Sequence, residues 1–137
     1  MRVALAHGVF DLLSAAHMEH LRQASMLADR LIVSVLADAA VGKIFLIDDE
    51  QTRMLKVSRV KGVDDVVLCK AAGPWELLRS IRPDIYVRKD EYQSKVQPEY
   101  EVAKELGIEC AFTTTAYPHV KEIIQRIWDL KGKYDDR

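Results

Sequence analysis

A chain of 137 residues can bury a hydrophobic core without disulfides, and 49% hydrophobic with 30% charged residues is ordinary globular composition. The net charge of −1 gives no support for nucleic acid or an anionic membrane surface as a partner, so we expect neither. Cys69 and Cys110 lie in apolar runs typical of strands, which favours buried free thiols over a disulfide or a metal pair. Because Met1 leads straight into such a run, and no apolar run approaches the roughly 20 residues of a membrane span, we expect one cytoplasmic domain over residues 1–137.

Along the chain, apolar runs of strand type alternate with segments of helical periodicity. Strands are expected at Val3–Ala6, Leu31–Leu36, Asp65–Leu68, Ile85–Arg88 and Glu109–Phe112. Helices are expected at Ala15–Asp29, Asp49–Arg59, Pro74–Ile81, Pro98–Leu106 and about His119–Lys131. Strict alternation predicts an α/β fold: one Rossmann-like, doubly wound parallel sheet of five strands, with the first strand central and helices on both faces.

The junction between the first strand and the first helix is the first candidate site. In a doubly wound sheet, ligands bind at the carboxyl ends of the strands where the strand order reverses, which points to the loop from Ala6 to Ser14. Backbone N–H groups at a helix start lack partners within the helix, and the aligned peptide dipoles add a partial positive charge. We therefore expect a phosphate to bind at Gly8–His17.

This segment resembles the Gly-x-Phe-Asp-x-x-(His/Thr)-x-Gly-His signature of the cytidylyltransferase-like nucleotidyltransferases, which include glycerol-phosphate, heptose-phosphate and pantetheine-phosphate enzymes. Without gaps, the signature is matched by Gly8, Phe10, Asp11 and His17. Ser14 stands in place of the first His or Thr, and Ala16 stands in place of the glycine. The resemblance implies nucleotide binding by Gly8, Phe10, Asp11 and Ala16, the last with an added methyl where backbone and phosphate approach closely.

The resemblance also implies a reaction and three catalytic residues, His17, Ser14 and, in a later loop, Lys43. A nucleotidyl group would pass from CTP or ATP, with Mg²⁺ on the triphosphate, to a small phosphorylated sugar or polyol, and pyrophosphate would leave. The acceptor phosphate is already ionised, so positioning and charge neutralisation would carry catalysis. His17 is the expected catalytic donor, with a structural histidine as the alternative, and Ser14 partly replaces the missing His. His20 could form a metal pair with His17, but no third ligand is in register, so we expect no metal site.

Three cations further along lie in segments that resemble the family, and the resemblance implies that they contact the nucleotide phosphates. Lys43 is the only cation of the loop after the second expected strand, where relatives carry lysines that reach the triphosphate; a solvated turn is the alternative. Arg53, on the second expected helix, would approach the nucleotide phosphates or pair with a neighbouring carboxylate on the helix surface. Arg82–Tyr92 resembles the Lys-Pro-Asp-x-x-Val-Lys-Gly-x-Asp-Tyr stretch of the heptose-phosphate and glycerol-phosphate branch. In this alignment Arg88 supplies the positive charge of the second lysine, and Lys89 stands in place of the glycine.

The last motif, Thr115–Ile124, resembles Thr-x-Gly-Ile-Ser-Thr-Thr-x-Ile-Ile with its hydroxyls replaced. His119 and Lys121 would supply positive charge to the nucleotide at this helix start, and the alternative is a helix start without a ligand. Trp75 and Trp128 lie in helical apolar patterns and are expected in the core rather than as base-stacking platforms.

The altered positions leave a second hypothesis from another class. The chain would then be a catalytically degenerate nucleotide-binding or protein-interaction module on the same scaffold. A dehydrogenase of the Rossmann type is not indicated, because no Gly-x-Gly-x-x-Gly follows the first strand. By analogy with the relatives, a homodimer is expected. The base of the nucleotide and the identity of the acceptor stay open.

Overall fold

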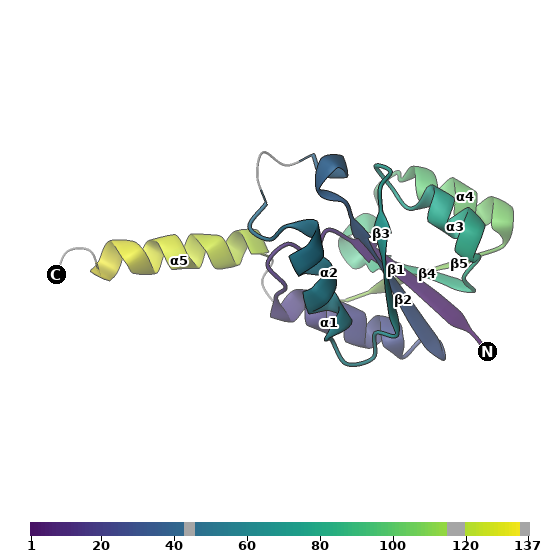
Figure 1. Cartoon of the computed structure of the whole chain (residues 1–137), viewed down its shortest axis with the longest axis horizontal. Helices are drawn as coiled ribbons and strands as arrows, with labels where there is room; N and C mark the ends of the chain where they lie inside the picture. The colour runs from purple at the N-terminus through teal and green to yellow at the C-terminus, as the bar shows by residue number, and fades with distance from the viewer. Residues whose placement is uncertain (43–45, 115–119, 135–137) are drawn as a thin grey trace.

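A parallel sheet of five strands forms the centre of the computed structural model, which describes residues 1–42, 46–114 and 120–134 (Figure 1). Its strands are β1 (Val3–Gly8), β2 (Arg30–Leu36), β3 (Asp65–Cys69), β4 (Ile85–Lys89) and β5 (Glu109–Thr113). They lie in the order β3-β2-β1-β4-β5, and every neighbouring pair is parallel. The prediction of a doubly wound sheet with the first strand central is therefore confirmed.

Helices cover both faces of this sheet. On one face lie α1 (Ala15–Ser25) and α2 (Glu50–Ser58), and on the other lie α3 (Trp75–Ile81) and α4 (Pro98–Leu106). Alternate residues of β1 supply the two cores: Ala4 and Ala6 pack with Leu21 of α1 and Val57 of α2, whereas Leu5 packs with α3 and α4. Two short 3₁₀ helices, η1 (Asp38–Ala40) and η2 (Asp90–Tyr92), follow β2 and β4 and were not predicted from the sequence.

The first helix is shorter than its periodicity predicts, because Asp29 is held by the start of β1. The Asp29 carboxylate accepts the backbone N–H of Arg2 at 2.7 Å, and the Asp29 N–H donates to the Arg2 carbonyl at 2.9 Å. The helix therefore ends at Ser25. The end of α4 follows the sequence instead: Gly107 has φ +72°, a conformation that favours glycine.

The last helix, α5 (Val120–Tyr134), extends away from the body of the molecule (Figure 1). Trp128 on this helix is 61% exposed, so its expected place in the core is wrong. Helical spacing indicated an apolar face correctly, but the described residues supply no core for that face to join. Trp75 does pack against the α3 and α4 core, and both cysteines are free thiols, Cys69 buried and Cys110 half-buried.

Candidate active site

A cleft of about 410 Å³ opens at the carboxyl end of the central strand. Its lining comes from the β1–α1 loop, from α1, from the end of β4 with η2, and from the first turn of α5. The lining residues are His7, Gly8, Val9, Phe10, Asp11, His17, His20, Arg88, Lys89, Glu91, Tyr92, Lys121 and Glu122. The cleft therefore lies where the strand order reverses, which is the place that the topology predicts for a ligand.

The β1–α1 loop makes a tight turn beneath this cleft. Phe10 and Leu12 adopt positive φ angles of 55° and 52°, which cost non-glycine residues roughly 1 kcal/mol or more and persist only where the surroundings hold them. The Phe10 ring is buried, and a Cβ on Gly8 would meet it at 3.0 Å, so residue 8 has almost no room for a side chain. Phe10 also places its ring edge against His17, with the ring centroids 5.5 Å apart.

His17 is held by the residue that caps its helix. The backbone N–H of Ser14 donates to Nδ1 of His17 at 3.1 Å, and the Ser14 hydroxyl accepts the backbone N–H of His17 at 3.4 Å. Because a backbone N–H can only donate, Nδ1 must carry a lone pair, and neutral His17 bears its proton on Nε2. Ser14 thus fixes both the start of α1 and the tautomer of a histidine that lines the cleft.

Two further histidines in the lining are kept neutral by burial. Burial, followed by the charge of Arg88, lowers the pKa of His7 to about 3, and its Nδ1 lies 2.7 Å from the Ser34 hydroxyl. Burial, followed by the charge of Lys89, lowers the pKa of His20 to about 3, and its Nδ1 lies 2.6 Å from the Thr113 hydroxyl. Both rings are therefore uncharged hydrogen-bonding groups at neutral pH.

Arg88 brings a buried positive charge to the same cleft. Its Nη1 donates to the Tyr86 hydroxyl at 3.1 Å and to Oε1 of Glu99 at 3.2 Å, and Glu99 is itself buried. The guanidinium carbon Cζ lies over the Tyr92 ring, 4.0 Å from its centroid. A guanidinium held by a carboxylate on one side and by an aromatic ring on another is fixed in place, which suits it to bind phosphate oxygens.

A second hollow of about 420 Å³ continues from the first. The two share His7, Gly8, Val9, Arg88 and Tyr92, and the second adds Leu36, Ala72, Gly73, Pro74, Trp75, Gln97, Pro98 and Glu99. This hollow lies toward the starts of α3 and α4, whereas the first lies toward α1 and α5. Arg88 stands between the two hollows, so one charged group can face ligands in both.

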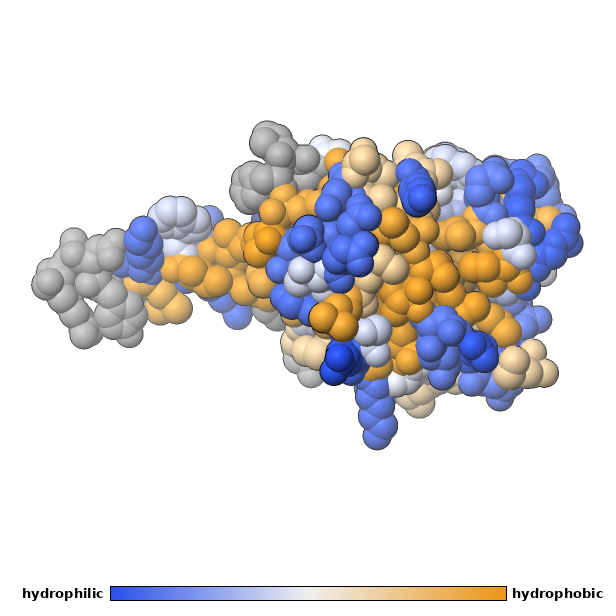
Figure 2. Space-filling model, viewed as in Figure 1, coloured by the Kyte–Doolittle hydropathy of each residue, from blue (hydrophilic) through white to orange (hydrophobic). Residues whose placement is uncertain are grey.

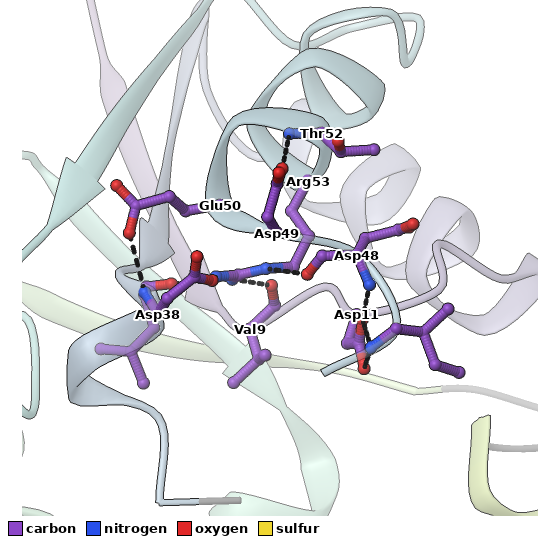
Figure 3. A network of polar contacts seen from close by, with 10 residues as sticks. Val9, Asp11, Asp38, Asp48, Asp49, Glu50, Thr52 and Arg53 are labelled. Atoms are coloured by element: carbon purple, nitrogen blue, oxygen red, sulfur yellow. Dashed lines mark hydrogen bonds and ion pairs between the residues drawn. The ribbon is translucent and has the colours of Figure 1, made fainter. Parts of the chain in front are cut away.

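Arg53 does not line either hollow. Its side chain is fully buried, and Nη1 donates to the carbonyls of Val9 at 2.8 Å and Leu36 at 2.7 Å (Figure 3). Nη2 pairs with the Asp38 carboxylate at 2.6 Å, and Nε donates to the Asp48 carbonyl at 3.2 Å. Arg53 thus binds the β1–α1 loop, the end of β2, η1 and the segment before α2 together.

Asp11 completes this connection from the other side. Its carboxylate accepts the backbone N–H groups of Ile47 and Asp48 at 2.9 to 3.2 Å, so it holds the segment before α2 against the β1–α1 loop (Figure 3). The Asp49 carboxylate then caps α2 by accepting the Thr52 N–H at 2.8 Å, and this hydrogen bond lowers the pKa of Asp49. We call the contacts of Arg53 and Asp11 the α2 anchor.

The structure brings together some of the residues that the sequence suggested and separates others. Those that line the cleft are Gly8, Phe10, Asp11, His17, Arg88 and Lys121. Those outside its lining are Ser14, which caps α1, buried Ala16, and Arg53 in the α2 anchor. Arg53 was expected either at the nucleotide phosphates or paired with a carboxylate on the surface of its own helix. Instead it is buried outside both hollows, and its carboxylate partner, Asp38, belongs to η1. Lys43 and His119 lie outside the described residues.

Sequence reasoning missed three groups in and around the cleft. His7 directly follows the first expected strand, so the argument from the carboxyl ends of strands could have found it. Tyr92 lies in the stretch that resembles the family but received no role. Glu99 carried no signal at all, because its partner Arg88 lies on another element, 11 residues away.

The described residues contain no group of three or more His, Cys, Asp or Glu side chains that could hold a metal ion. In the part of the chain that the structure describes, no helix is long and apolar enough to cross a membrane. Carboxylates do reach the cleft, since Glu91 and Glu122 belong to its lining.

A family model described as cytidylyltransferase-like matches residues 5–126, which is most of the chain. The chain therefore belongs to the cytidylyltransferase-like family of nucleotidyltransferases, as the signature at Gly8–His17 indicated.

Individual relatives agree with this assignment. The chain is 33% identical over 111 residues to the bifunctional protein HldE of Wolinella succinogenes, a match covering 78% of this chain and 23% of HldE. The HldE of Caulobacter vibrioides is 36% identical over 96 residues, covering 67% of this chain and 20% of HldE. The chain thus spans about a quarter or less of the length of these relatives.

Among solved structures, the lipopolysaccharide core biosynthesis protein of Thermoplasma volcanium superposes with a TM-score of 0.68 at 29% identity. The superposition covers 87% of this chain and 99% of that protein. Pantothenate synthetase of Thermus thermophilus, at 13% identity and a TM-score of 0.56, shares the fold.

Proposed function

We propose that the protein transfers a nucleotidyl group from CTP or ATP to a small phosphorylated sugar or polyol. An oxygen of the acceptor phosphate attacks the α-phosphorus, a new P–O bond forms, and the bond between the α-phosphorus and the bridging oxygen breaks. The electron pair of that bond leaves with pyrophosphate. The name of the Thermoplasma protein, which assigns it to lipopolysaccharide core biosynthesis, supports a sugar acceptor, as does the resemblance of Arg82–Tyr92 to the heptose-phosphate and glycerol-phosphate branch.

One observation carries the proposal. The start of α1, the Nε2–H tautomer of His17, and the cations Arg88, Lys89 and Lys121 all lie around one cleft beyond the central strand. A triphosphate needs several donors and positive charges that are already in place when charge moves onto the leaving pyrophosphate. His17 would donate to a phosphate oxygen from Nε2, while the cations neutralise the transferred group.

The two hollows suggest how the substrates are divided. We assign the triphosphate to the first hollow, near the α1 start, and the phosphorylated acceptor to the second, near Trp75 and Glu99. A buried carboxylate accepts hydrogen bonds from hydroxyl groups, which a sugar or polyol presents. Arg88, shared by both hollows, would bring the attacking phosphate toward the α-phosphorus.

Mg²⁺ would enter with the triphosphate and supply charge neutralisation on the phosphate oxygens. Such an ion takes oxygen ligands and keeps several waters, so it needs few protein groups. Glu91 and Glu122 are the cleft carboxylates that could serve it, while the Asp11 carboxylate is occupied by backbone N–H groups. A cytoplasmic location fits a substrate that is a nucleoside triphosphate.

A pyrophosphate-release assay tests the proposal. CTP, ATP, GTP and UTP are each combined with Mg²⁺ and a panel of sugar and polyol phosphates, and release should depend on one triphosphate together with one acceptor. The double variant Ser14→His with Ala16→Gly restores the family signature and should raise turnover by roughly 10² or more if a catalytic donor is regained.

The same assay distinguishes the second hypothesis, a module that binds without catalysis. Thermal shifts with the four triphosphates should then show binding, because a ligand of the folded state raises its stability, while both chains release no pyrophosphate. Acceptor-dependent turnover by the natural chain would eliminate that hypothesis. If neither the natural chain nor the double variant releases pyrophosphate across the panel, the result would count against an enzymatic function.

A further inference from the structure

His7 lies where the two hollows of the site meet. It lines both of them, together with Gly8, Val9, Arg88 and Tyr92. Its side chain is only 7% exposed, so the small part that is accessible must be in contact with this space. No step of the proposed reaction uses this histidine, although a residue at the junction can reach ligands in either hollow.

The register of the sheet places His7 between two polar neighbours on one face. Leu5 of β1 and Tyr86 of β4 are partners in the sheet, and both belong to the core that packs against α3 and α4. His7 and Arg88 follow two residues later on the same strands, so their side chains lie next to each other on that face. On the other side of His7, its register partner is Ser34 of β2. The three side chains therefore form a row across the ends of β2, β1 and β4.

One nitrogen of the His7 ring is held by this row and the other is open. Nδ1 lies 2.7 Å from the hydroxyl of Ser34, which is fully buried. Among the described residues, Nε2 has no hydrogen-bond partner, and no buried side-chain nitrogen or oxygen in that part of the chain lacks one. Nε2 is therefore not buried, and it faces the hollows that His7 lines.

The Ser34 hydroxyl allows this open nitrogen to be a donor. It lies 3.4 Å from the Ala6 carbonyl, so it can donate there and accept from Nδ1 of His7, or donate to Nδ1 instead. In the second arrangement the neutral ring carries its proton on Nε2. An anion beside Nε2 favours this arrangement, because a hydrogen bond from N–H replaces the repulsion of a lone pair.

The ligand that suits this junction is an anion. Burial, followed by the charge of Arg88, lowers the pKa of His7 to about 3, so a neutral donor stands beside a fixed positive charge. Such a pair attracts an anion and repels a cation. The outer part of α5 differs, since apolar atoms follow that helix beyond the body of the molecule (Figure 2). Within the site, the groups at the junction are suited to a phosphate.

We propose that His7 is a further catalytic residue, whose Nε2–H donates to a non-bridging oxygen of the transferred α-phosphate. This inference rests on the proposed function. The α-phosphate passes from the triphosphate in the first hollow to the acceptor in the second, so it must cross the junction that His7 and Arg88 line. A donor that is already in place stabilises charge on the phosphate oxygens in the transition state without reorganisation. His7 acts there from the β1 end, while His17 donates from α1.

Two substitutions at residue 7 test the donor. His7→Leu removes both ring nitrogens, so kcat should fall on the order of 10²-fold, while KM for the triphosphate should change by less than about threefold. His7→Gln offers an amide N–H near the position of Nε2 and should recover at least about tenfold of that loss. All rates are expressed per folded molecule, because both variants replace a buried side chain.

His20→Leu is the matched control. This histidine is also buried, but it lies on α1 on the other face of the sheet, is hydrogen-bonded to Thr113 and does not line the second hollow. The variant should lose stability while kcat falls by less than about tenfold. If His7→Leu lowers kcat no more than His20→Leu does, or if His7→Gln is no better than His7→Leu, the inference is wrong.

Nitrogen NMR of the natural chain tests the contact without a variant that must fold. The probes are α,β-methylene-ATP and α,β-methylene-CTP with Mg²⁺, which keep the triphosphate shape but do not transfer a nucleotidyl group. Binding of one analogue should move the Nε2 signal of His7 to the position of a protonated, hydrogen-bonded nitrogen, and its Nδ1 signal to that of a nitrogen with a lone pair. The ring signals of His20 should keep the positions of a neutral ring.

The outcomes separate this inference from the proposed function. If an analogue binds and moves the signals of His17 but not those of His7, the inference is wrong and the proposed function stands. If neither analogue binds, the proposed function is wrong and the inference fails with it. If a sugar or polyol phosphate alone moves the His7 signals and the analogues do not, His7 belongs to the acceptor site, which also overturns the inference.

Discussion

The cleft and the α2 anchor each include a residue of the Gly8–His17 signature, His17 in the cleft and Asp11 in the anchor, yet the polar groups of the two regions have different partners. In the cleft, His17, Arg88 and Lys121 reach a hollow that a ligand could fill. In the α2 anchor, Arg53 donates to backbone carbonyls and to the Asp38 carboxylate, and the carboxylate of Asp11 accepts backbone N–H groups. A polar residue in a motif can therefore serve the ligand or the loop that surrounds the ligand, and the direction of its donors decides which.

Replacing His17 tests the cleft side and should have the largest effect. His17→Ala removes the proposed donor to the phosphates, so turnover should fall by about 10²–10³, as for loss of one oxyanion donor. Affinity for the triphosphate should change far less if this contact strengthens in the transition state. Steady-state kinetics and calorimetric binding measure the two quantities.

His20→Ala is the matched control on the same helix. His20 is buried and hydrogen-bonded to Thr113, so His20→Ala should lower the free energy of unfolding. The turnover of the molecules that remain folded should fall much less than in His17→Ala. Equal losses of turnover in both variants would favour a metal pair or simple destabilisation over a catalytic His17.

Replacing Arg53 tests the α2 anchor. Arg53→Met keeps the length of the side chain but leaves the carbonyls of Val9 and Leu36 without their donor, at about 1–3 kcal/mol each. The free energy of unfolding should therefore fall by about 3 kcal/mol in a urea titration. Lys56→Met removes a more exposed ion pair to Asp48 from the same helix and should cost less than about 1 kcal/mol.

Arg53→Met also separates a role of Arg53 in folding from a role in binding the nucleotide. If Arg53→Met keeps its stability but loses affinity for a triphosphate, Arg53 contacts the ligand and our assignment of it to the α2 anchor is wrong.

The fold was predictable because its signals are local. Each strand and helix is indicated by the hydrophobic pattern of a few neighbouring residues, and the alternation of the two predicts a parallel sheet covered by helices. The Gly8–His17 junction was predictable for the same reason, since strand, turn and helix start are adjacent in the chain. That its residues bind a nucleotide stays a prediction.

The rest of the site depends on contacts between distant segments. Arg53 binds carbonyls 44 and 17 residues before it, and no pattern on its own helix reveals them. The pairing of Arg88 with Glu99 joins a strand to a helix after an irregular loop. Trp128 was misplaced because an amphipathic pattern shows that a face will be covered, but not whether the same chain covers it.

Acidification should act on the cleft through its two buried histidines. The pKa of His7 and of His20 is about 3 in the folded protein and about 6.5 in an unfolded chain, so below pH 6.5 the unfolded state binds more protons. Stability is thus full above pH 6.5 and falls as the pH drops toward 3, by about 1.4 kcal/mol per pH unit for each ring. Urea titrations between pH 7.5 and 5 measure this slope.

Replacing one of the two histidines should halve their joint contribution to the pH dependence of the free energy of unfolding. The pH dependence of the free energy of unfolding should fall by about one proton in His20→Asn, and by about two protons in a double variant that also carries His7→Asn. The α2 anchor contains no histidine, so Arg53→Met should lower stability equally at every pH in this range. An unchanged slope in His20→Asn would show that its ring is accessible to protons in the folded state.

The smallest expected effect concerns Lys121, the exposed cation that α5 brings to the cleft. Its charge is largely screened by water, so Lys121→Met should raise the dissociation constant of a triphosphate only about two- to fivefold, and less at high salt. Lys131→Met is the control: this lysine lies on the same helix over the Trp128 ring, 5.0 Å from its centroid, ten residues from Lys121. Equal weakening by both variants would mean that α5 acts through its overall charge. Weakening by Lys121→Met alone would show that the start of α5 borders the phosphates, so that a helix extending away from the sheet would belong to the cleft.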